Sequence, residues 1–158
     1  MLSKEPVLSR LEKATLLKNA VAKYYIKKNY AVNFEVGLDK YGRFRADVIA
    51  VNMGSQIIIV EVKSCKEDLI RDSKFLNYLK FCNKMYFVFD VKTYEKVKDL
   101  VPKGVGIFVM SPLGLVKVKK SASTREITPK IQLSVLTRMC YRSADRNSHY
   151  HKSKVPNV

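Results

Sequence analysis

The sequence predicts an α/β fold in which a mixed central sheet is flanked by helices, in the order α-β-β-β-α-β with additions. Three observations support this prediction. The chain has 158 residues, of which 47% are apolar, and this is enough to build the core of one domain. A segment with helical periodicity comes first and is followed by three short strand-like runs. Beyond them, fully apolar strands alternate with further helical segments.

The first predicted element is a helix over residues 8–28. Its apolar residues recur with a helical period, and lysines fill the opposite face. They are Leu11, Leu16, Leu17, Ala20, Val21, Tyr24 and Tyr25. We interpret the two tyrosines as core residues rather than as a platform on which bases stack.

Three strands are predicted next, over residues 31–38, 44–51 and 56–62, as an antiparallel meander. Residues 39–43 and 52–55 are rich in turn formers and separate them. The loop lengths predict which side chains face one another. If the first hairpin has a three-residue loop, residues that face each other across it have numbers that sum to 82. Glycine is the last residue of this loop and is expected to form a left-handed bulge. In the second hairpin, with a loop of the same length, such numbers sum to 108.

A second helix is predicted directly after the third strand and extends to about Phe81. Ser64 and Glu67 form a capping-box pattern at its start, and three leucines then recur on one face. The remaining elements are strands over residues 85–89 and 106–110, a helix over 93–100 between them, and an edge strand near 115–118. A last helix starts at Thr128-Pro129, since proline is favoured at the first helical position.

The charge is strongly basic and unevenly distributed. Thirty Lys and Arg oppose 14 Asp and Glu, so the net charge is +16, and half of it lies in residues 117–158. We therefore divide the chain into a domain over 1–120, a C-terminal helical addition over 121–142 and a basic mobile tail over 143–158. Such a charge predicts a polyanionic partner, with nucleic acid first and an anionic membrane surface second.

Composition also argues against several classes of protein. No run approaches the roughly 18 apolar residues that a membrane span needs, and the first residues lack a signal-peptide core. A soluble, cytoplasmic protein is therefore expected. Three widely spaced cysteines favour reduced thiols over a disulfide framework or a zinc site.

Two acids interrupt strands that are otherwise apolar. Asp47 lies within the second strand and Glu61 within the third, where Lys63 shares the face of Glu61 because side chains two apart point the same way. The predicted register places Asp47 directly across from Glu61, with Cβ atoms about 5 Å apart. It also places Glu35 opposite Asp47, so three carboxylates would form a row beside Lys63. Taken alone, Glu61 and Lys63 could be a simple ion pair at a strand end.

A row of like charges on apolar strands is costly unless a divalent cation neutralises it. Carboxylate oxygens favour Mg²⁺ or Mn²⁺. A cation there would polarise a phosphodiester oxygen and lower the pKa of a coordinated water, while Lys63 orients that water or stabilises charge on the phosphorus. The row therefore predicts metal-dependent phosphodiester hydrolysis.

The same features resemble the PD-(D/E)XK nuclease superfamily, in which an acid on strand two precedes Glu-x-Lys on strand three of an α-β-β-β-α-β core. More narrowly, the sequence resembles the MmcB-like family of DNA-repair-associated nucleases, from about Leu17 to Lys119. The residues that carry this likeness are Arg45-Ala46-Asp47, Ile59-Val60-Glu61-Val62-Lys63-Ser64, Asp68, Asp72-Ser73-Lys74, Tyr78 and Cys82.

The resemblance implies a restriction-endonuclease-like fold and roles for single residues. Asp47, Glu61 and Lys63 match the catalytic acid, acid and lysine positions, and the backbone carbonyl of Val62 matches a further metal ligand. The family also tends to have glutamate where Glu35 stands. Two departures stand out: alanine replaces the proline that names the motif, and the first helix lacks the acid that resolvases use, since Glu12 lies more than a turn too early.

DNA is the expected partner, without a membrane. Arg71 and Lys74 are expected to contact the phosphate backbone and Tyr78 to pack on sugar or base, with Arg45 as a fourth nucleic-acid contact. A solvated helix face is the alternative for the first three. Three further questions stay open: whether the chain is a non-catalytic binding module, whether it acts on RNA, and whether it forms a homodimer, since a monomer of this size could cut only one strand per visit.

Overall fold

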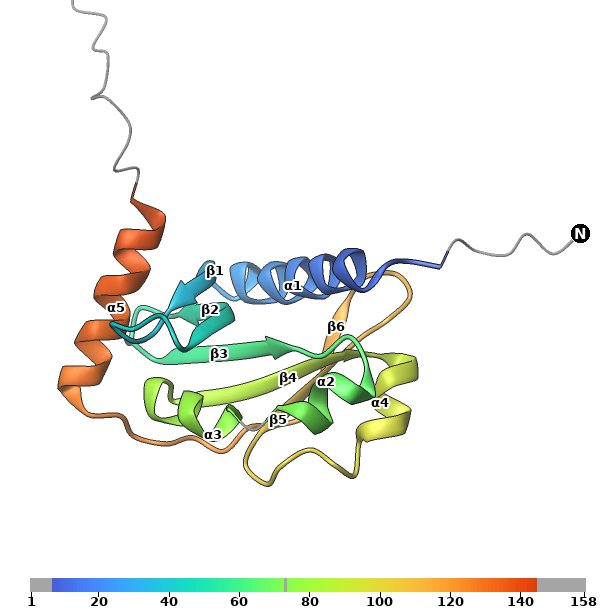
Figure 1. Cartoon of the computed structure of the whole chain (residues 1–158). Coiled ribbons are helices and arrows are strands. Elements are labelled where there is room, and N and C mark those ends of the chain that lie inside the picture. The colour runs from blue at the N-terminus through green and yellow to red at the C-terminus, as the bar shows by residue number, and fades with distance from the viewer. Residues whose placement is uncertain (1–6, 73, 145–158) are drawn as a thin grey trace, which may run out of the picture.

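The computed structural model describes residues 7–72 and 74–144 and places six strands in one sheet, in the order β1-β2-β3-β4-β5-β6 (Figure 1). β1, β2 and β3 pair antiparallel, β3, β4 and β5 pair parallel, and β6 returns antiparallel. The predicted α/β fold class is therefore confirmed. The strands are β1 (Ala31–Gly37), β2 (Arg45–Val51), β3 (Ile57–Val62), β4 (Lys84–Asp90), β5 (Gly106–Met110) and β6 (Val116–Lys120).

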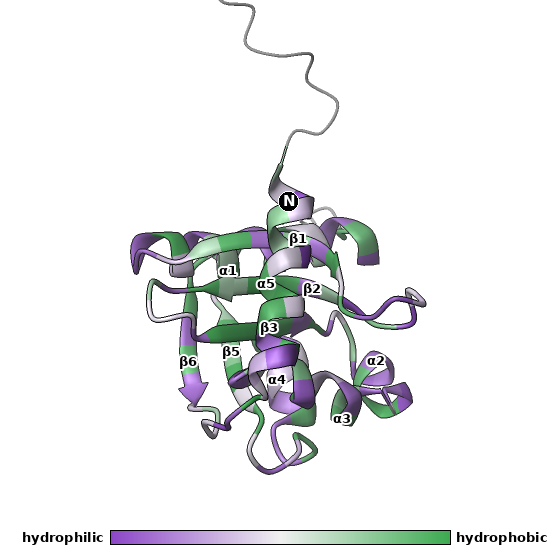
Figure 2. Cartoon of the chain, turned by 90° about the vertical axis from the view of Figure 1, so that its left-hand side faces the viewer, coloured by the Kyte–Doolittle hydropathy of each residue, from purple (hydrophilic) through white to green (hydrophobic). Residues whose placement is uncertain are grey.

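Helices cover the sheet, whose middle strands are largely hydrophobic (Figure 2). In the described part of the chain, no helix is long and apolar enough to cross a membrane. The helices are α1 (Arg10–Lys27), α2 (Lys66–Arg71), α3 (Phe75–Tyr78) with the 3₁₀ turn η1 (Leu79–Phe81), α4 (Val91–Val97) and α5 (Pro129–Ser143).

The helix α1 packs across one face of the sheet. Leu17, Val21 and Tyr25 are buried there against residues such as Val60 and Phe108. The interpretation of the tyrosines as core residues is confirmed, because the Tyr24 and Tyr25 rings pack edge-to-face with each other and with Phe108.

Glu12 takes part in the cap at the start of α1. The Glu12 amide donates to Oγ of Ser9, and the Ser9 amide donates to Oε2 of Glu12 at 2.7 Å. This reciprocal cap satisfies two amide groups that the first turn leaves without helical partners. Glu12 therefore belongs to the helix cap.

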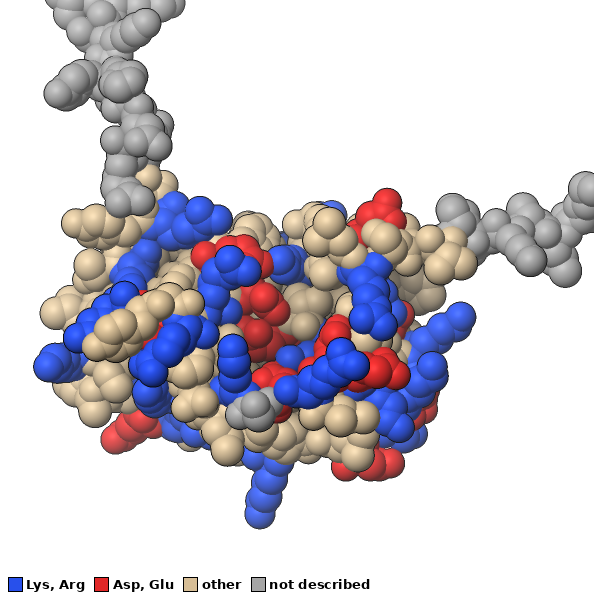
Figure 3. Space-filling view, in the orientation of Figure 1, with Lys and Arg blue, Asp and Glu red and all other residues tan. Residues whose placement is uncertain are grey.

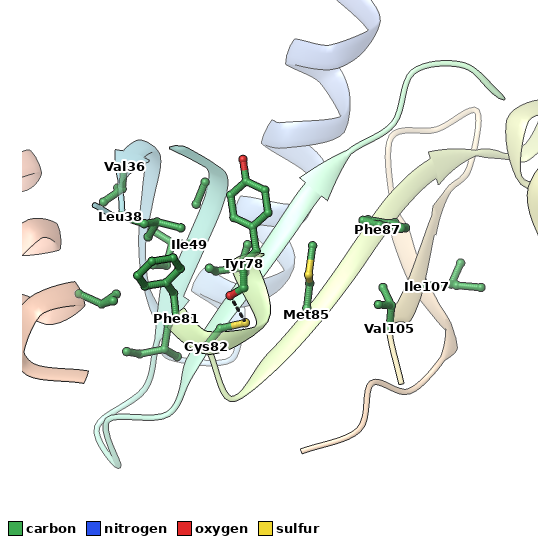
Figure 4. Packing of buried hydrophobic residues seen from close by; sticks show 14 of the residues in the cluster. Val36, Leu38, Ile49, Tyr78, Phe81, Cys82, Met85, Phe87, Val105 and Ile107 are labelled. Atoms are coloured by element: carbon green, nitrogen blue, oxygen red, sulfur yellow. Dashed lines mark hydrogen bonds between the residues drawn. The ribbon is translucent and has the colours of Figure 1, made fainter. Parts of the chain in front are cut away.

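The opposite face of the sheet holds the larger hydrophobic cluster, part of which Figure 4 shows. Ile49, Ile59 and Phe87 from the sheet meet residues of α2, η1, α4 and α5 there. Val135 and Met139 of α5 are buried in this cluster. The helix α5 thus shares the core of the strands, while the predicted basic tail lies mostly beyond Ala144 and outside the described residues.

Both hairpins have the predicted register. Phe34 pairs with Val48, and Val48 pairs with Val60, as three-residue loops require. Gly42 has φ +67° in the first loop, the left-handed conformation that glycine adopts without steric cost. Ser55 takes a similar conformation at the end of the second loop, with φ +61°.

The prediction of one continuous second helix is wrong. The helix α2 ends at Arg71, and α3 starts at Phe75. The cause is Asp72, whose Oδ1 accepts a hydrogen bond from the Lys74 amide at 2.9 Å and whose backbone is extended. A side chain that binds backbone two residues ahead competes with the helical hydrogen bond.

The predicted capping box at Ser64 is also corrected. The amide and the hydroxyl of Ser64 both donate to Oδ2 of Asp68, not to Glu67. The helix starts one residue later than expected, at Lys66, with Cys65 at its N-cap position. Asp68 therefore makes the contact with Ser64 that the capping-box pattern assigned to Glu67.

Candidate active site

Asp47 and Glu61 meet where β2 and β3 separate. Regular backbone pairing of the two strands stops at Val48 and Val60. Beyond that point the amide of Asp47 donates to Oε1 of Glu61 at 3.1 Å, and the amide of Val62 donates to Oδ2 of Asp47 at 2.8 Å. Each carboxylate therefore replaces a carbonyl of the strand ladder, and the two acids lie side by side.

Burial makes the negative charge of this pair costly. Glu61 is only 6% exposed. Burial raises the pKa of Asp47, although the Val62 amide opposes the rise. Burial, and then the charge of Asp47, raise the pKa of Glu61 well above its ordinary value. Neither carboxylate forms an ion pair with a cation among the described residues.

Lys63 lies beside the acids but is paired elsewhere. Its ammonium lies 2.6 Å from Oδ2 of Asp72, and each of these side chains is 9% exposed. The ring of Phe87 lies against the same ammonium, with 5.3 Å between Nζ and the ring centroid. The third strand therefore points Lys63 into the site, and the break between α2 and α3 supplies its partner.

These residues line a hollow of about 360 Å³. In Figure 3, acidic side chains gather in the middle of the visible face, and Lys and Arg surround them. Arg71 and Lys74 line the hollow and are exposed, as a role in backbone contact requires. The residues that line it are Asp47, Glu61, Val62, Lys63, Asp68, Arg71, Asp72, Lys74 and Tyr78.

Tyr78 does not match its predicted role. It lines the hollow but is only 8% exposed, and its hydroxyl donates to the backbone carbonyl of Arg45 at 3.3 Å. Its ring packs edge-to-face against Phe44. Burial, and then the charge of Glu61, raise the pKa of Tyr78 to about 12. A ring packed in this way supports the wall of the site and cannot stack on a base.

Glu35 does not complete a row with the other two acids. Its carboxylate forms ion pairs with Lys18 of α1 and with Nε of Arg45, the latter at 2.7 Å. Glu35 has φ +54°, and its neighbours Phe34 and Val36 pack on opposite faces of the sheet. Side chains two apart on a regular strand, such as those of Phe34 and Val36, normally point to the same face of the sheet. The backbone of β1 is therefore irregular at Glu35, and the Glu35 side chain turns toward α1.

The chemistry of the donors fits a small divalent cation. The part of the chain that the structure describes has no group of three or more Asp, Glu, His or Cys side chains placed to hold a metal ion. Magnesium in phosphoryl-transfer sites is typically bound by one or two carboxylates together with water and substrate phosphates. Two adjacent carboxylates, one buried and one half-buried and neither in an ion pair among the described residues, therefore suit Mg²⁺ or Mn²⁺.

Comparison with known proteins identifies the family. The model described as DNA repair protein MmcB-like matches residues 5–153. The chain belongs to the MmcB-like family. No curated protein matches it. Among solved structures, a protein of unknown function from Silicibacter pomeroyi has a TM-score of 0.73 at 18% identity, over 82% of this chain and 84% of that one.

A second solved structure is more distant. A repair endonuclease from Pyrococcus abyssi has a TM-score of 0.41 at 15% identity, over 70% of this chain and 50% of that one. The likeness to the Silicibacter structure supports the fold of this MmcB-like chain.

Two residues of the MmcB-like site were assigned no role from the sequence. Asp72 holds Lys63, and Lys18 holds Glu35. Asp72-Ser73 lies in the middle of the expected second helix, and Asp and Ser both favour turns over helix interiors. This dipeptide was the local signal for the break that brings Asp72 to Lys63. Nothing local distinguishes Lys18 from the other lysines of α1.

Proposed function

We propose that this protein is a metal-dependent nuclease that hydrolyses DNA phosphodiester bonds. The observation that carries the proposal is the adjacent pair of Asp47, which is half-buried, and Glu61, which is buried, neither of which forms an ion pair among the described residues. Such a pair is costly in a folded protein unless a cation compensates it. The description of the family as DNA repair proteins supports the same substrate.

Asp47, Glu61 and the backbone carbonyl of Val62 are the proposed metal ligands. Bound Mg²⁺ or Mn²⁺ would supply Lewis acidity toward the phosphodiester and toward the attacking water. The chain's own contribution is to keep the two carboxylates fixed, because each accepts a hydrogen bond from a backbone amide of the neighbouring strand.

Lys63 is the proposed catalytic cation. Its ammonium is held at the edge of the hollow by Asp72 and by the face of Phe87. From there it would stabilise the negative charge that builds on the phosphate oxygens in the transition state or orient the attacking water. A positioned charge in a site that excludes most water is worth far more than the same charge in solvent.

Arg71 and Lys74 are the proposed contacts to the phosphate backbone, because both line the hollow and are exposed. Arg45 is exposed too, but its guanidinium is paired with Glu35. Phosphate contacts carry no sequence information, so binding that tolerates many sequences and weakens with salt is expected.

The test is cleavage of labelled duplex, branched and single-stranded DNA and of single-stranded RNA, with Mg²⁺, Mn²⁺ or EDTA. We expect DNA cleavage that requires the divalent ion and is lost in Asp47→Asn and Glu61→Gln. Binding without cleavage of any substrate would favour a non-catalytic binding module. Cleavage of RNA alone would move the substrate class to RNA.

A further inference from the structure

A second and larger hollow, which shares no lining residue with the first, lies between α5 and the end of β1. Its volume is about 640 Å³, and Val36 and Gly37 form the side that β1 contributes. None of the described residues that line it is acidic. α5 itself contains no Asp or Glu. We call this hollow the α5 groove.

Basic and hydroxyl side chains follow one stripe of α5 along the groove. Lys130, Ser134, Arg138 and Arg142 recur every fourth residue, and all of them line the groove. Residues four apart lie above one another on a helix. The stripe from Lys130 to Arg142 is about 18 Å long at 1.5 Å per residue. That length spans about five base-pair steps along the axis of a DNA duplex at about 3.4 Å each, so it suits several phosphates and not a single anion.

The arginines retain hydrogen-bonding capacity. Nε of Arg138 is buried and has no hydrogen-bond partner in the described part of the chain. Nε of Arg142 donates to the backbone carbonyl of Phe34 at 3.0 Å, which anchors its guanidinium beside β1. Tyr141 is 59% exposed next to them and adds an aromatic surface to the groove. Arginine together with an exposed aromatic ring is the combination that contacts nucleic-acid backbone and bases.

The one acidic residue of β1, Glu35, does not cancel this charge. Glu35 precedes Val36 in sequence, but Lys18 and Arg45 already neutralise its carboxylate. The groove therefore keeps the full positive charge of α5.

The groove also lies close to the carboxylate site. Val36, which lines the groove, pairs across the strands with Ala46, the neighbour of Asp47. Neighbouring strands lie about 4.8 Å apart. Figure 3 shows basic side chains to the left of the acidic centre, over the region of α5 and the β1–β2 hairpin. A nucleic-acid strand that leaves the carboxylate hollow and crosses the β1–β2 hairpin would next reach the α5 groove.

We propose that the α5 groove binds the sugar–phosphate backbone of nucleic acid on one side of the phosphodiester bond that lies at the carboxylate site. Lys130, Arg138 and Arg142 contact successive phosphates, with Ser134 as an additional donor. The choice of nucleic acid as ligand rests on the proposed function. The binding itself requires neither a metal ion nor hydrolysis.

The test is the affinity of the full chain for a fluorescent DNA duplex, measured by anisotropy in EDTA at several salt concentrations. The groove variant is Lys130→Gln/Arg138→Gln/Arg142→Gln. Its matched control is Lys23→Gln/Lys27→Gln/Lys119→Gln, which removes the same charge from exposed positions on α1 and β6. Thermal unfolding and circular dichroism check that each variant is folded.

We expect the groove variant to bind at least about tenfold more weakly than the control variant. The slope of log affinity against log salt should fall by about 2 to 3, since each lost phosphate contact removes about 0.9. Equal losses in both variants, or wild-type affinity in the groove variant, would overturn the inference.

Two further variants keep the test decisive if the triple variant unfolds. Lys130→Glu alone, at an exposed position, should reduce the salt slope by about 1 to 2. Arg138→Lys/Arg142→Lys retains the charge and should retain most of the slope. An unchanged slope in Lys130→Glu would contradict backbone binding in the groove.

A competition experiment tests whether the groove binds nucleic acid or an acidic protein. Poly-glutamate of matched charge should displace the DNA poorly from the wild-type chain. Equal displacement would assign the groove to acidic proteins and overturn the inference. Because every measurement is made in EDTA, a wild-type chain that fails to cleave DNA contradicts the proposed nuclease and leaves the result for the groove unaffected.

Discussion

The ammonium of Lys63 and the carboxylate of Asp72 form a buried ion pair at 2.6 Å, which joins the end of β3 to the break between α2 and α3. Both side chains are 9% exposed, so solvent screens the pair little. Removing one partner of a buried pair leaves an uncompensated charge and costs about 3 to 5 kcal/mol. Replacing both with apolar residues of similar size is often neutral.

Asp72→Leu is therefore expected to lower the free energy of unfolding by about 3 kcal/mol, whereas Lys63→Met/Asp72→Leu restores most of that loss. Urea denaturation of the wild type, the two single variants and the double variant measures the coupling. Additive losses in the double variant would show that the two side chains do not stabilise one another.

Lys63→Ala should reduce the rate of DNA cleavage at least about 100-fold, the usual effect of losing a positioned group that stabilises transition-state charge. Its affinity for Mn²⁺, measured by calorimetry, should stay close to that of the wild type. An equal loss of metal binding would make Lys63 a structural residue of the site.

Asp47→Ala and Glu61→Ala should abolish cleavage while DNA affinity in EDTA stays the same or rises. Each substitution removes a negative charge that repels phosphate. Lys96→Ala, at an exposed position of α4, is the control and should cleave normally. Wild-type cleavage rates in both acid variants would rule out this site as the active centre.

The free energy of unfolding without metal should fall as pH rises above the ordinary values of 3.8 for Asp47 and 4.5 for Glu61. The folded state holds protons on these acids that the unfolded state has already released, so deprotonation disfavours folding. The decline should continue until pH passes the raised pKa values. Asp47→Asn/Glu61→Gln should remove most of this slope in thermal or urea unfolding.

Mg²⁺ should stabilise the wild type more at higher pH, because the ligands must be deprotonated to bind it. The same ion should have little effect on the unfolding of Asp47→Asn/Glu61→Gln. Equal stabilisation of both proteins at all pH values would place magnesium binding elsewhere.

Glu35→Gln should reduce cleavage by less than about tenfold, far below the loss expected for a catalytic group. The carboxylate of Glu35 is held by Lys18 and Arg45 and does not line the hollow. Single-turnover cleavage assays compare it with Glu61→Gln. Similar losses in the two variants would show that Glu35 acts directly in the reaction.

The sequence alone determined the strands and the pairing of the two central acids. Hairpin loops act over a few residues, so the left-handed Gly42 and the three-residue loops fix the register without help from the rest of the chain. The position of Asp47 beside Glu61 follows directly. The face of α1 that carries Tyr24 and Tyr25 was likewise readable from its helical period.

Tertiary contacts decided the remaining geometry. Glu35 turns away because α1 brings Lys18 to it, and Lys63 is held because a break in the second helix brings Asp72 to it. Tyr78 is buried because it packs against Phe44 from the first hairpin. The α5 groove exists only because a helix about 100 residues downstream packs beside β1. Periodicity and turn chemistry report on neighbours in the chain, whereas these contacts join segments that only the packed core brings together.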